Sequence, residues 1–124
     1  MANSECVTVY IVDDDESVRD SARALLESYD LVVEDFGSAR AFLEVFETGS
    51  RGCVLLDVNM PEMSGLELLE LLRRREIGIP VIIVSAQSDA DVQERARRAG
   101  AFAFFEKPVD DSLIEAIGQA LKAA

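Results

Sequence analysis

Carboxylates lie at the ends of two apolar segments of this sequence. Asp13 and Asp14 follow the segment 7–12, and Asp57 ends the run 53–56. An apolar run without alternation is typical of a strand covered on both faces, as in a parallel sheet. Ligands of open α/β sheets bind beyond the carboxyl ends of the strands. The sequence therefore predicts that Asp57 is the chemical centre of the protein.

Two further strand-like segments end in residues of different chemistry. Segment 81–84 ends at Ser85, and segment 101–105 is followed by Glu106 and Lys107. If all these strands are parallel, three carboxylates, one hydroxyl and one ammonium converge at one edge of the sheet. The sequence contains no histidine, so a Ser–Lys pair is the one nucleophile–base combination of the serine or cysteine type that remains.

Three adjacent carboxylates repel one another. Two of them about 4 Å apart repel by about 4 kcal/mol at an effective dielectric constant of about 20. Either the pKa of one carboxyl group rises or a cation binds. Mg²⁺ suits such an oxygen site and also accepts phosphate oxygens. Because Lys107 adds a second positive charge, the cluster is suited to a phosphoryl group, with a carboxylate nucleophile as in aspartyl-phosphate enzymes.

Each feature also has an interpretation without function. An acidic triplet before a helix often only caps it, Lys-Pro after a strand is usually punctuation, and a serine after a strand indicates little. An aspartate that ends a buried strand is more specific. All four features, in order and each at the end of a separate strand, favour a functional site.

The elements that carry these residues alternate between strand and helix. Strands are predicted over residues 7–12, 31–36, 53–57, 81–84 and 101–105, each followed by a helix. Helix caps are expected at Asp14 or Asp15, at Ser38, at Ser64 with Glu67 in a capping box, and at Asp89, with Gly100 ending the fourth helix. This pattern predicts one α/β domain over residues 1–124. Its fold is a doubly wound, flavodoxin-like five-stranded parallel sheet in the order 2-1-3-4-5.

Composition opposes several functions. The formal net charge of −12 over 124 residues opposes direct binding to nucleic acid or to an anionic membrane surface. No apolar run approaches the ~20 residues of a membrane span, and residues 1–5 lack the basic-then-apolar order of a signal peptide. Cys6 and Cys53 are expected to be reduced thiols of a cytoplasmic protein, with a disulfide between them as the alternative.

Four motifs together resemble the receiver domain of two-component response regulators, the CheY-like class. They are Val12-Asp13-Asp14-Asp15, Leu56-Asp57-Val58-Asn59-Met60-Pro61-Glu62-Met63-Ser64-Gly65, Val84-Ser85-Ala86 and Glu106-Lys107-Pro108. The resemblance covers essentially the whole chain. Within the class the sequence is most similar to FixJ-type receivers, on Ile11-Val12-Asp13-Asp14 and Phe105-Glu106-Lys107-Pro108.

The resemblance implies a role for each acidic residue. Asp57 would accept a phosphoryl group from the phosphohistidine of a sensor histidine kinase. Asp14, Asp57 and the backbone carbonyl of Asn59 would bind Mg²⁺ directly, and Asp13 would act mainly through a bridging water.

It also implies a switch. Lys107 would contact the phosphate, and Ser85 would donate its hydroxyl to it after a small loop movement. Phe104 occupies the position of the family's rotating aromatic and would turn inward behind Ser85, which changes the surface of the fourth helix and fifth strand. Simple core packing is the alternative for Phe104. A homodimer through that surface is a further hypothesis, in which arginines of the fourth helix meet acids of a second subunit: Arg95, Arg97 and Arg98.

The resemblance implies a signalling phosphoacceptor rather than a metabolic enzyme, with self-phosphotransfer and slow autodephosphorylation as its chemistry. Its expected output is transcriptional, through a partner or a further domain. The alternatives are a stand-alone single-domain regulator and a receiver-like interaction module that is never phosphorylated. A phosphohydrolase with an aspartyl intermediate would need a substrate-binding cap, and no segment is long enough to supply one.

Overall fold

The computed structural model describes most of the chain, namely residues 7–46, 50–86, 89–107 and 109–123. Two sequence predictions lie outside these ranges: the reduced state of Cys6 and the punctuating role of Pro108. None of the helices in the described ranges is both long enough and apolar enough to cross a membrane.

Strands and helices alternate along the described residues. The strands are β1 (Thr8–Val12), β2 (Val32–Phe36), β3 (Gly52–Asp57), β4 (Val81–Ser85) and β5 (Ala103–Glu106). The helices are α1 (Glu16–Glu27), α2 (Ala39–Val45), α3 (Gly65–Arg74), α4 (Ala90–Arg98) and α5 (Asp111–Ala123). Neighbouring strands pair in parallel in the order β2-β1-β3-β4-β5, which confirms the predicted doubly wound fold.

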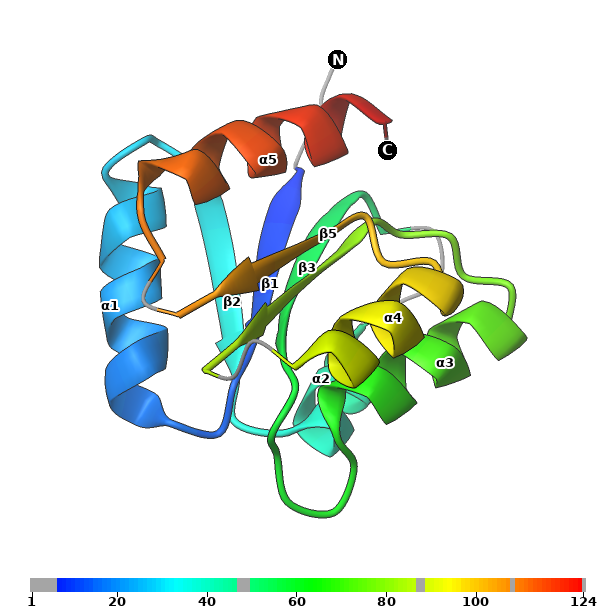
Figure 1. Cartoon of the computed structure of the whole chain (residues 1–124). Coiled ribbons are helices and arrows are strands. Elements are labelled where there is room, and N and C mark those ends of the chain that lie inside the picture. The colour runs from blue at the N-terminus through cyan, green and yellow to red at the C-terminus, as the bar shows by residue number, and fades with distance from the viewer. Residues whose placement is uncertain (1–6, 47–49, 87–88, 108, 124) are drawn as a thin grey trace.

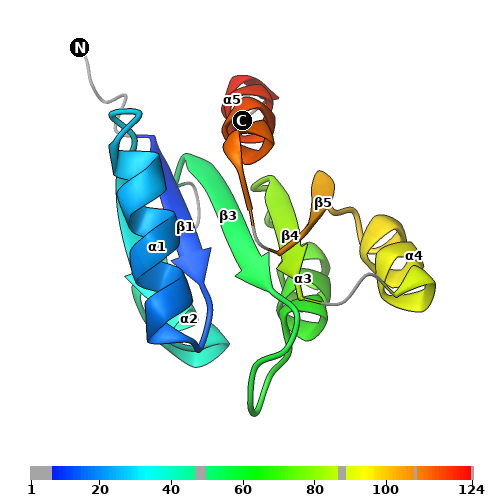
Figure 2. The same cartoon turned by 60° about the vertical axis from the view of Figure 1, so that its left-hand side comes forward.

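Helices cover both faces of the sheet, as Figures 1 and 2 show. Helices α1 and α5 pack on one face, where Leu26, Leu113 and Ile117 meet the side chains of β1, β3 and β4. Helices α2, α3 and α4 pack on the other face, where Phe42 and the leucines of α3 bury the alternate strand residues. Strands β1, β3 and β4 are therefore buried along their whole length, as their unbroken apolar runs predict.

The predicted helix caps are confirmed. Asp15, and not Asp14, caps α1 by accepting from the backbone N–H groups of Ser17 and Val18. The other caps are Ser38 on α2, Ser64 in a complete capping box with Glu67 on α3, and Asp89 on α4. With Asp15 engaged at the helix terminus, the two preceding aspartates lie in the short connection from β1 to α1.

Strand β5 begins two residues later than the sequence predicts. Gly100, with a φ of 92°, ends α4: its N–H donates to the carbonyl of Arg97, and the N–H of Ala101 donates to the carbonyl of Ala96. This pair of bonds is a Schellman motif, which confirms the predicted helix stop at Gly100. The motif keeps Ala101 out of the strand despite its apolar surroundings.

Cys53 is a buried free thiol on β3. Burial raises its pKa to about 12, so the thiolate that would react with oxidants or metals is scarce at neutral pH. This agrees with the prediction of a reduced structural cysteine.

Gly65, the first residue of α3, lies against the end of β3. A Cβ atom at this position would stand 2.1 Å from the carbonyl oxygen of Asp57, closer than any real contact allows. The absence of a side chain lets the helix begin directly behind the residue that the sequence places at the chemical centre. Gly65 therefore helps to fix the backbone of Asp57.

We expect Gly65→Ala to destabilise the protein by about 2–3 kcal/mol, because the added methyl group forces the helix away from a buried strand. Urea denaturation followed by circular dichroism measures the free energy of unfolding.

Gly118→Ala is the matched control, because Gly118 lies inside α5 with nothing within 4 Å of the position of a Cβ atom. This variant should be more stable than the wild type by about 0.5–1 kcal/mol, the usual gain of alanine over glycine within a helix. Wild-type stability of Gly65→Ala would contradict the close approach of α3 to Asp57.

Candidate functional site

Two buried carboxylates stand side by side where β1 and β3 end. Val12 lies opposite Leu56 in the parallel register, so the chain continues into Asp13 and Asp57 at the same level. Asp13 is 4% exposed and Asp57 is 6% exposed, whereas Asp14 faces solvent. One carboxylate oxygen from each of the three aspartates lies within 4.8 Å of the others. The structure thus brings together the acids that the sequence places at separate strand ends.

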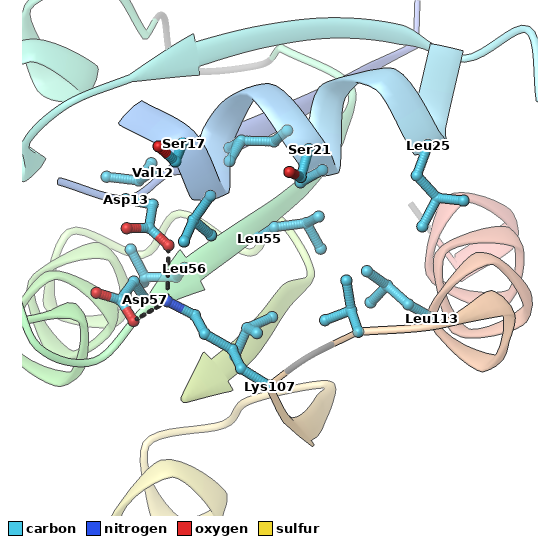
Figure 3. A pocket seen from close by; sticks show the side chains of 15 residues that line it. Val12, Asp13, Ser17, Ser21, Leu25, Leu55, Leu56, Asp57, Lys107 and Leu113 are labelled. Carbon is cyan, nitrogen blue, oxygen red and sulfur yellow. Dashed lines mark hydrogen bonds and ion pairs between the residues drawn. The ribbon is translucent and has the colours of Figure 1, made fainter. Parts of the chain in front are cut away.

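Lys107 joins the two buried carboxylates. Its Nζ atom lies 2.9 Å from Oδ2 of Asp13 and 3.0 Å from Oδ1 of Asp57, as Figure 3 shows. The backbone N–H of Lys107 donates to the carbonyl oxygen of Ser85 at 2.7 Å, which ties the end of β5 to the end of β4. Lys107 therefore reaches the two acids from the end of β5, past the end of β4.

The remaining candidate residues lie around this centre. Ser85 is buried at the end of β4, opposite Glu106 of β5. Asn59 is exposed in the loop two residues after Asp57. Phe104 lies opposite Ile83, is partly buried, and packs against the core beneath α4. The position of Phe104 agrees with core packing and with a switch.

The electrostatics of the site follow from burial and from the pairing with Lys107. Burial raises the pKa of Asp57 above its usual value and the charge of Asp13 adds to the rise, while Lys107 opposes both effects. Burial lowers the pKa of Lys107, but its hydrogen bonds to Asp13 and Asp57 outweigh this, so the pKa is raised overall. The site holds its lysine charged and keeps a carboxylate in a place where negative charge is unfavourable.

The residues present fit a hard divalent cation. Three carboxylates supply oxygen ligands within one small volume, and one lysine neutralises only part of their charge. Asp14 is exposed, so its carboxylate can bind an ion that retains several waters, as Mg²⁺ does. The donor set contains oxygen atoms and no sulfur or imidazole, which favours Mg²⁺ over zinc or copper.

An apolar groove opens beside the acids between α1 and α5. It has a volume of about 640 Å³ and extends from Asp13, Asp57 and Lys107 past Leu55 and Leu25 (Figure 3). Burial dominates the pKa of Asp57 because this carboxylate is only 6% exposed at the end of a buried strand.

Arg19 of α1 also touches the site, and the sequence does not single it out. Its Nη1 atom donates to the backbone carbonyl oxygen of Asp13 at 2.7 Å. A cation near the N-terminus of a helix opposes the helix dipole, so dipole rules give no reason to single out Arg19. No periodicity or capping rule predicts its contact with Asp13.

The arginines of α4 have acidic partners within the chain. Arg95 binds Glu70 of α3 through two nitrogens at 2.9 and 3.0 Å, and Arg97 and Arg98 both bind Glu94. These pairs favour the interpretation that the arginines lie on a solvated helix face. They do not favour arginines that bind acids of a second subunit. A dimer through α4 and β5 would therefore bring together arginines that already have acidic partners in their own chain.

Comparison with known proteins identifies the family. The family described as "Response regulator receiver domain" matches residues 9–118. The chain belongs to this family. Receiver domains are signalling domains of two-component response regulators, so the resemblance given by the motifs is confirmed.

The receiver domain is similar to transcriptional regulators of this class. It is 44% identical over 115 residues to the transcriptional regulatory protein TdiR of Thauera aromatica, covering 92% of this chain and 51% of that protein. It is 43% identical over 110 residues to FixJ of Azorhizobium caulinodans, covering 89% and 52%. The chain thus spans about half the length of these relatives.

The solved structures agree with the predicted FixJ likeness. The crystal structure of FixJ-N superposes with a TM-score of 0.88 at 38% identity, covering 100% of this chain and 98% of that chain. The receiver fold and its FixJ-like character are therefore confirmed for this chain.

Lys107→Met should destabilise the receiver domain in EDTA by an amount on the order of 2 kcal/mol, because two buried carboxylates lose the cation between them. Asp57→Asn should have the opposite effect at neutral pH. A carboxyl group whose pKa is raised by folding stabilises the fold at low pH and loses that contribution as pH rises through the folded pKa, so the ionised group is unfavourable at pH 7.

Urea denaturation at pH 7 in EDTA tests both variants. Lys122→Met on the exposed end of α5 is the matched control and should leave the free energy of unfolding unchanged. A Lys107→Met variant as stable as the control, or an Asp57→Asn variant less stable than the wild type, would contradict the described charge arrangement.

Proposed function

We propose that this receiver domain accepts a phosphoryl group on Asp57 and thereby switches the surface formed by α4 and β5. The observation that carries the proposal is the pairing of one lysine with two buried carboxylates, Asp13 and Asp57, at the carboxyl edge of the sheet. A site with excess negative charge and one fixed ammonium is prepared for a cation and a phosphate together.

Asp57 is the proposed nucleophile. One of its carboxylate oxygens attacks phosphorus of a phosphohistidine, a P–O bond forms, the P–N bond breaks, and the imidazole nitrogen leaves with the electron pair. Lys107 holds Oδ1 of Asp57 at 3.0 Å, which fixes the carboxylate before the attack. The same ammonium is positioned to neutralise negative charge on the transferred phosphoryl oxygens.

The remaining acids serve the proposed cation site. Asp14, Asp57 and the backbone carbonyl of Asn59 are the expected ligands of Mg²⁺, with Asp13 acting through water. When bound, Mg²⁺ supplies positive charge that offsets the phosphoryl oxygens. Asp13 keeps its own bond to Lys107 and so orients the lysine toward Asp57.

The proposed output is a shift between two states. A phosphate adds about 1.5 to 2 negative charges and strong acceptor oxygens. Ser85 donates its hydroxyl to one of them after the segment beyond β4 moves, and Phe104 turns inward behind it. Because Phe104 packs under α4, its rotation changes the outer face of α4 and β5.

The proposed partner is a sensor histidine kinase that acts on this domain in the cytoplasm. The relatives TdiR and FixJ are transcriptional regulators, which supports a transcriptional output. Homodimerisation through α4 and β5 is the proposed consequence of phosphorylation. The domain is proposed to extend over residues 1–124 and not to bind nucleic acid itself. Its own chemistry is limited to phosphotransfer and slow hydrolysis of the acyl phosphate.

Incubation with acetyl phosphate and Mg²⁺, followed by intact-mass measurement, tests the proposal. We expect one added phosphoryl group on Asp57, which is a buried carboxylate held by Lys107 beside the proposed cation site. EDTA should abolish the labelling, since Lys107 alone offsets only part of the negative charge.

Asp57→Asn should remove the labelling, whereas Asp20→Asn, which changes an exposed aspartate on α1, should retain it. Labelling that persists in Asp57→Asn would place the acceptor elsewhere. If acetyl phosphate does not label the wild type in the presence of Mg²⁺, the result would favour an interaction module that is never phosphorylated.

A further inference from the structure

Arg19 joins three elements beside the acidic site. From its place on α1, Nη1 donates to the carbonyl oxygen of Asp13 at 2.7 Å, and Nε lies 3.5 Å from Oδ1 of Asp35 on β2. The Arg19 side chain is 17% exposed, so this contact is largely shielded from solvent. A charge-assisted bond of this kind is stronger than an ordinary hydrogen bond.

The end of edge strand β2 and the glycine after it leave room for this guanidinium. A Cβ atom at Gly37 would lie 3.3 Å from Nη1 of Arg19, so the glycine leaves the room that the guanidinium occupies. Asp35 is also bound by Arg23 at 2.6 Å, one helical turn further along α1. Arg23 therefore shares the carboxylate partner of Arg19, but the carbonyl contact to Asp13 is described only for Arg19.

The contacted carbonyl belongs to the peptide plane between the two site aspartates. The C=O of Asp13 and the N–H of Asp14 lie in one rigid plane, so fixing the oxygen restricts where the Asp14 side chain begins. The N–H of Asp13 donates to the carbonyl of Phe36 at 3.1 Å, and Oδ1 of Asp13 accepts from the N–H of Asp15 at 2.9 Å. The guanidinium of Arg19 adds a further bond to Asp13, at its backbone carbonyl oxygen.

We infer that Arg19 is a positioning residue for the cation site. By holding the Asp13 carbonyl, it fixes the turn that points Asp13 inward to Lys107 and leaves Asp14 facing solvent beside Asp57. Asp35 supplies the negative charge that pairs with Arg19, and Gly37 leaves space for its guanidinium. The inference rests on the proposed function for the identity of the ion, Mg²⁺.

The charge of Arg19 weakens the binding of Mg²⁺, whereas its proposed positioning role strengthens it. The direction in which Mg²⁺ affinity changes when Arg19 is replaced therefore tests the inference. Removing a positive charge near an acidic cluster strengthens cation binding through space. Removing a residue that orients the ligands weakens it, by about tenfold for groups that support metal ligands in proteins. Arg19→Met and Arg23→Met delete the same charge and a partner of the same Asp35.

Isothermal titration with MgCl₂ compares the wild-type chain with both variants. We expect Arg19→Met to bind Mg²⁺ about tenfold more weakly than the wild type, whereas Arg23→Met binds as well or slightly better. At saturating Mg²⁺, labelling of Arg19→Met by acetyl phosphate should recover, because Asp57 and Lys107 are intact. Equal or tighter Mg²⁺ binding by Arg19→Met, or equal weakening in both variants, would overturn the inference.

Amide hydrogen exchange in EDTA provides a readout that does not depend on the metal. The N–H of Asp15 should exchange faster in Arg19→Met than in Arg23→Met, because its acceptor on Asp13 is less well held. Equal exchange in the two variants would overturn the inference. If the wild type binds no Mg²⁺, the proposed function fails, while this exchange measurement still decides the role of Arg19.

Discussion

The contact that the rest of the site depends on is the bridge from Lys107 to the carboxylates of Asp13 and Asp57. Two buried carboxylates next to each other are unfavourable, and one ammonium offsets only part of their charge. Burial raises the pKa of Asp57, and the charge of Asp13 adds to the rise. A second cation would relieve the repulsion further, and the charge of the proposed phosphoryl group would be shared by both cations. The proposed chemistry thus follows from the electrostatics of the resting site.

The fold positions these groups with little freedom. Parallel pairing carries the ends of β1 and β3 to the same level, and the N–H of Lys107 is tied to the carbonyl of Ser85. Gly65 lets α3 begin against the carbonyl of Asp57, and Arg19 holds the carbonyl of Asp13. Both aspartates are thus fixed through their backbones as well as through Lys107. Preorganisation of this kind is what makes a small cluster of charges effective.

The sequence predicts the convergence of the acids because that convergence is topological. Once Asp13, Asp57 and Lys107 are recognised as strand ends, parallel pairing places them together, and local rules identify the caps at Ser64 and Asp89. The strand pattern alone does not show which of Asp13 and Asp14 is buried. Which of the two faces inward depends on where the chain leaves β1.

Other features depend on contacts that no local pattern encodes. Arg19 reaches Asp13 and Asp35 across elements, and Glu70 pairs with Arg95 from a neighbouring helix. Glu62 adopts a φ of 71° in the loop after β3, although glutamate has no preference for that region. Such features arise from packing between distant segments, so periodicity and capping rules cannot reveal them.

The dependence of stability on Mg²⁺ tests the central claim most directly, namely that the acidic cluster requires a cation. Above the dissociation constant, the free energy of unfolding of the wild type should rise by about 1.4 kcal/mol for each tenfold increase in Mg²⁺. In Asp14→Asn, which removes one proposed ligand, the rise should largely disappear, while exposed Asp20→Asn should retain it. A wild-type stability that does not change with Mg²⁺, or an equal rise in Asp14→Asn, would contradict the account.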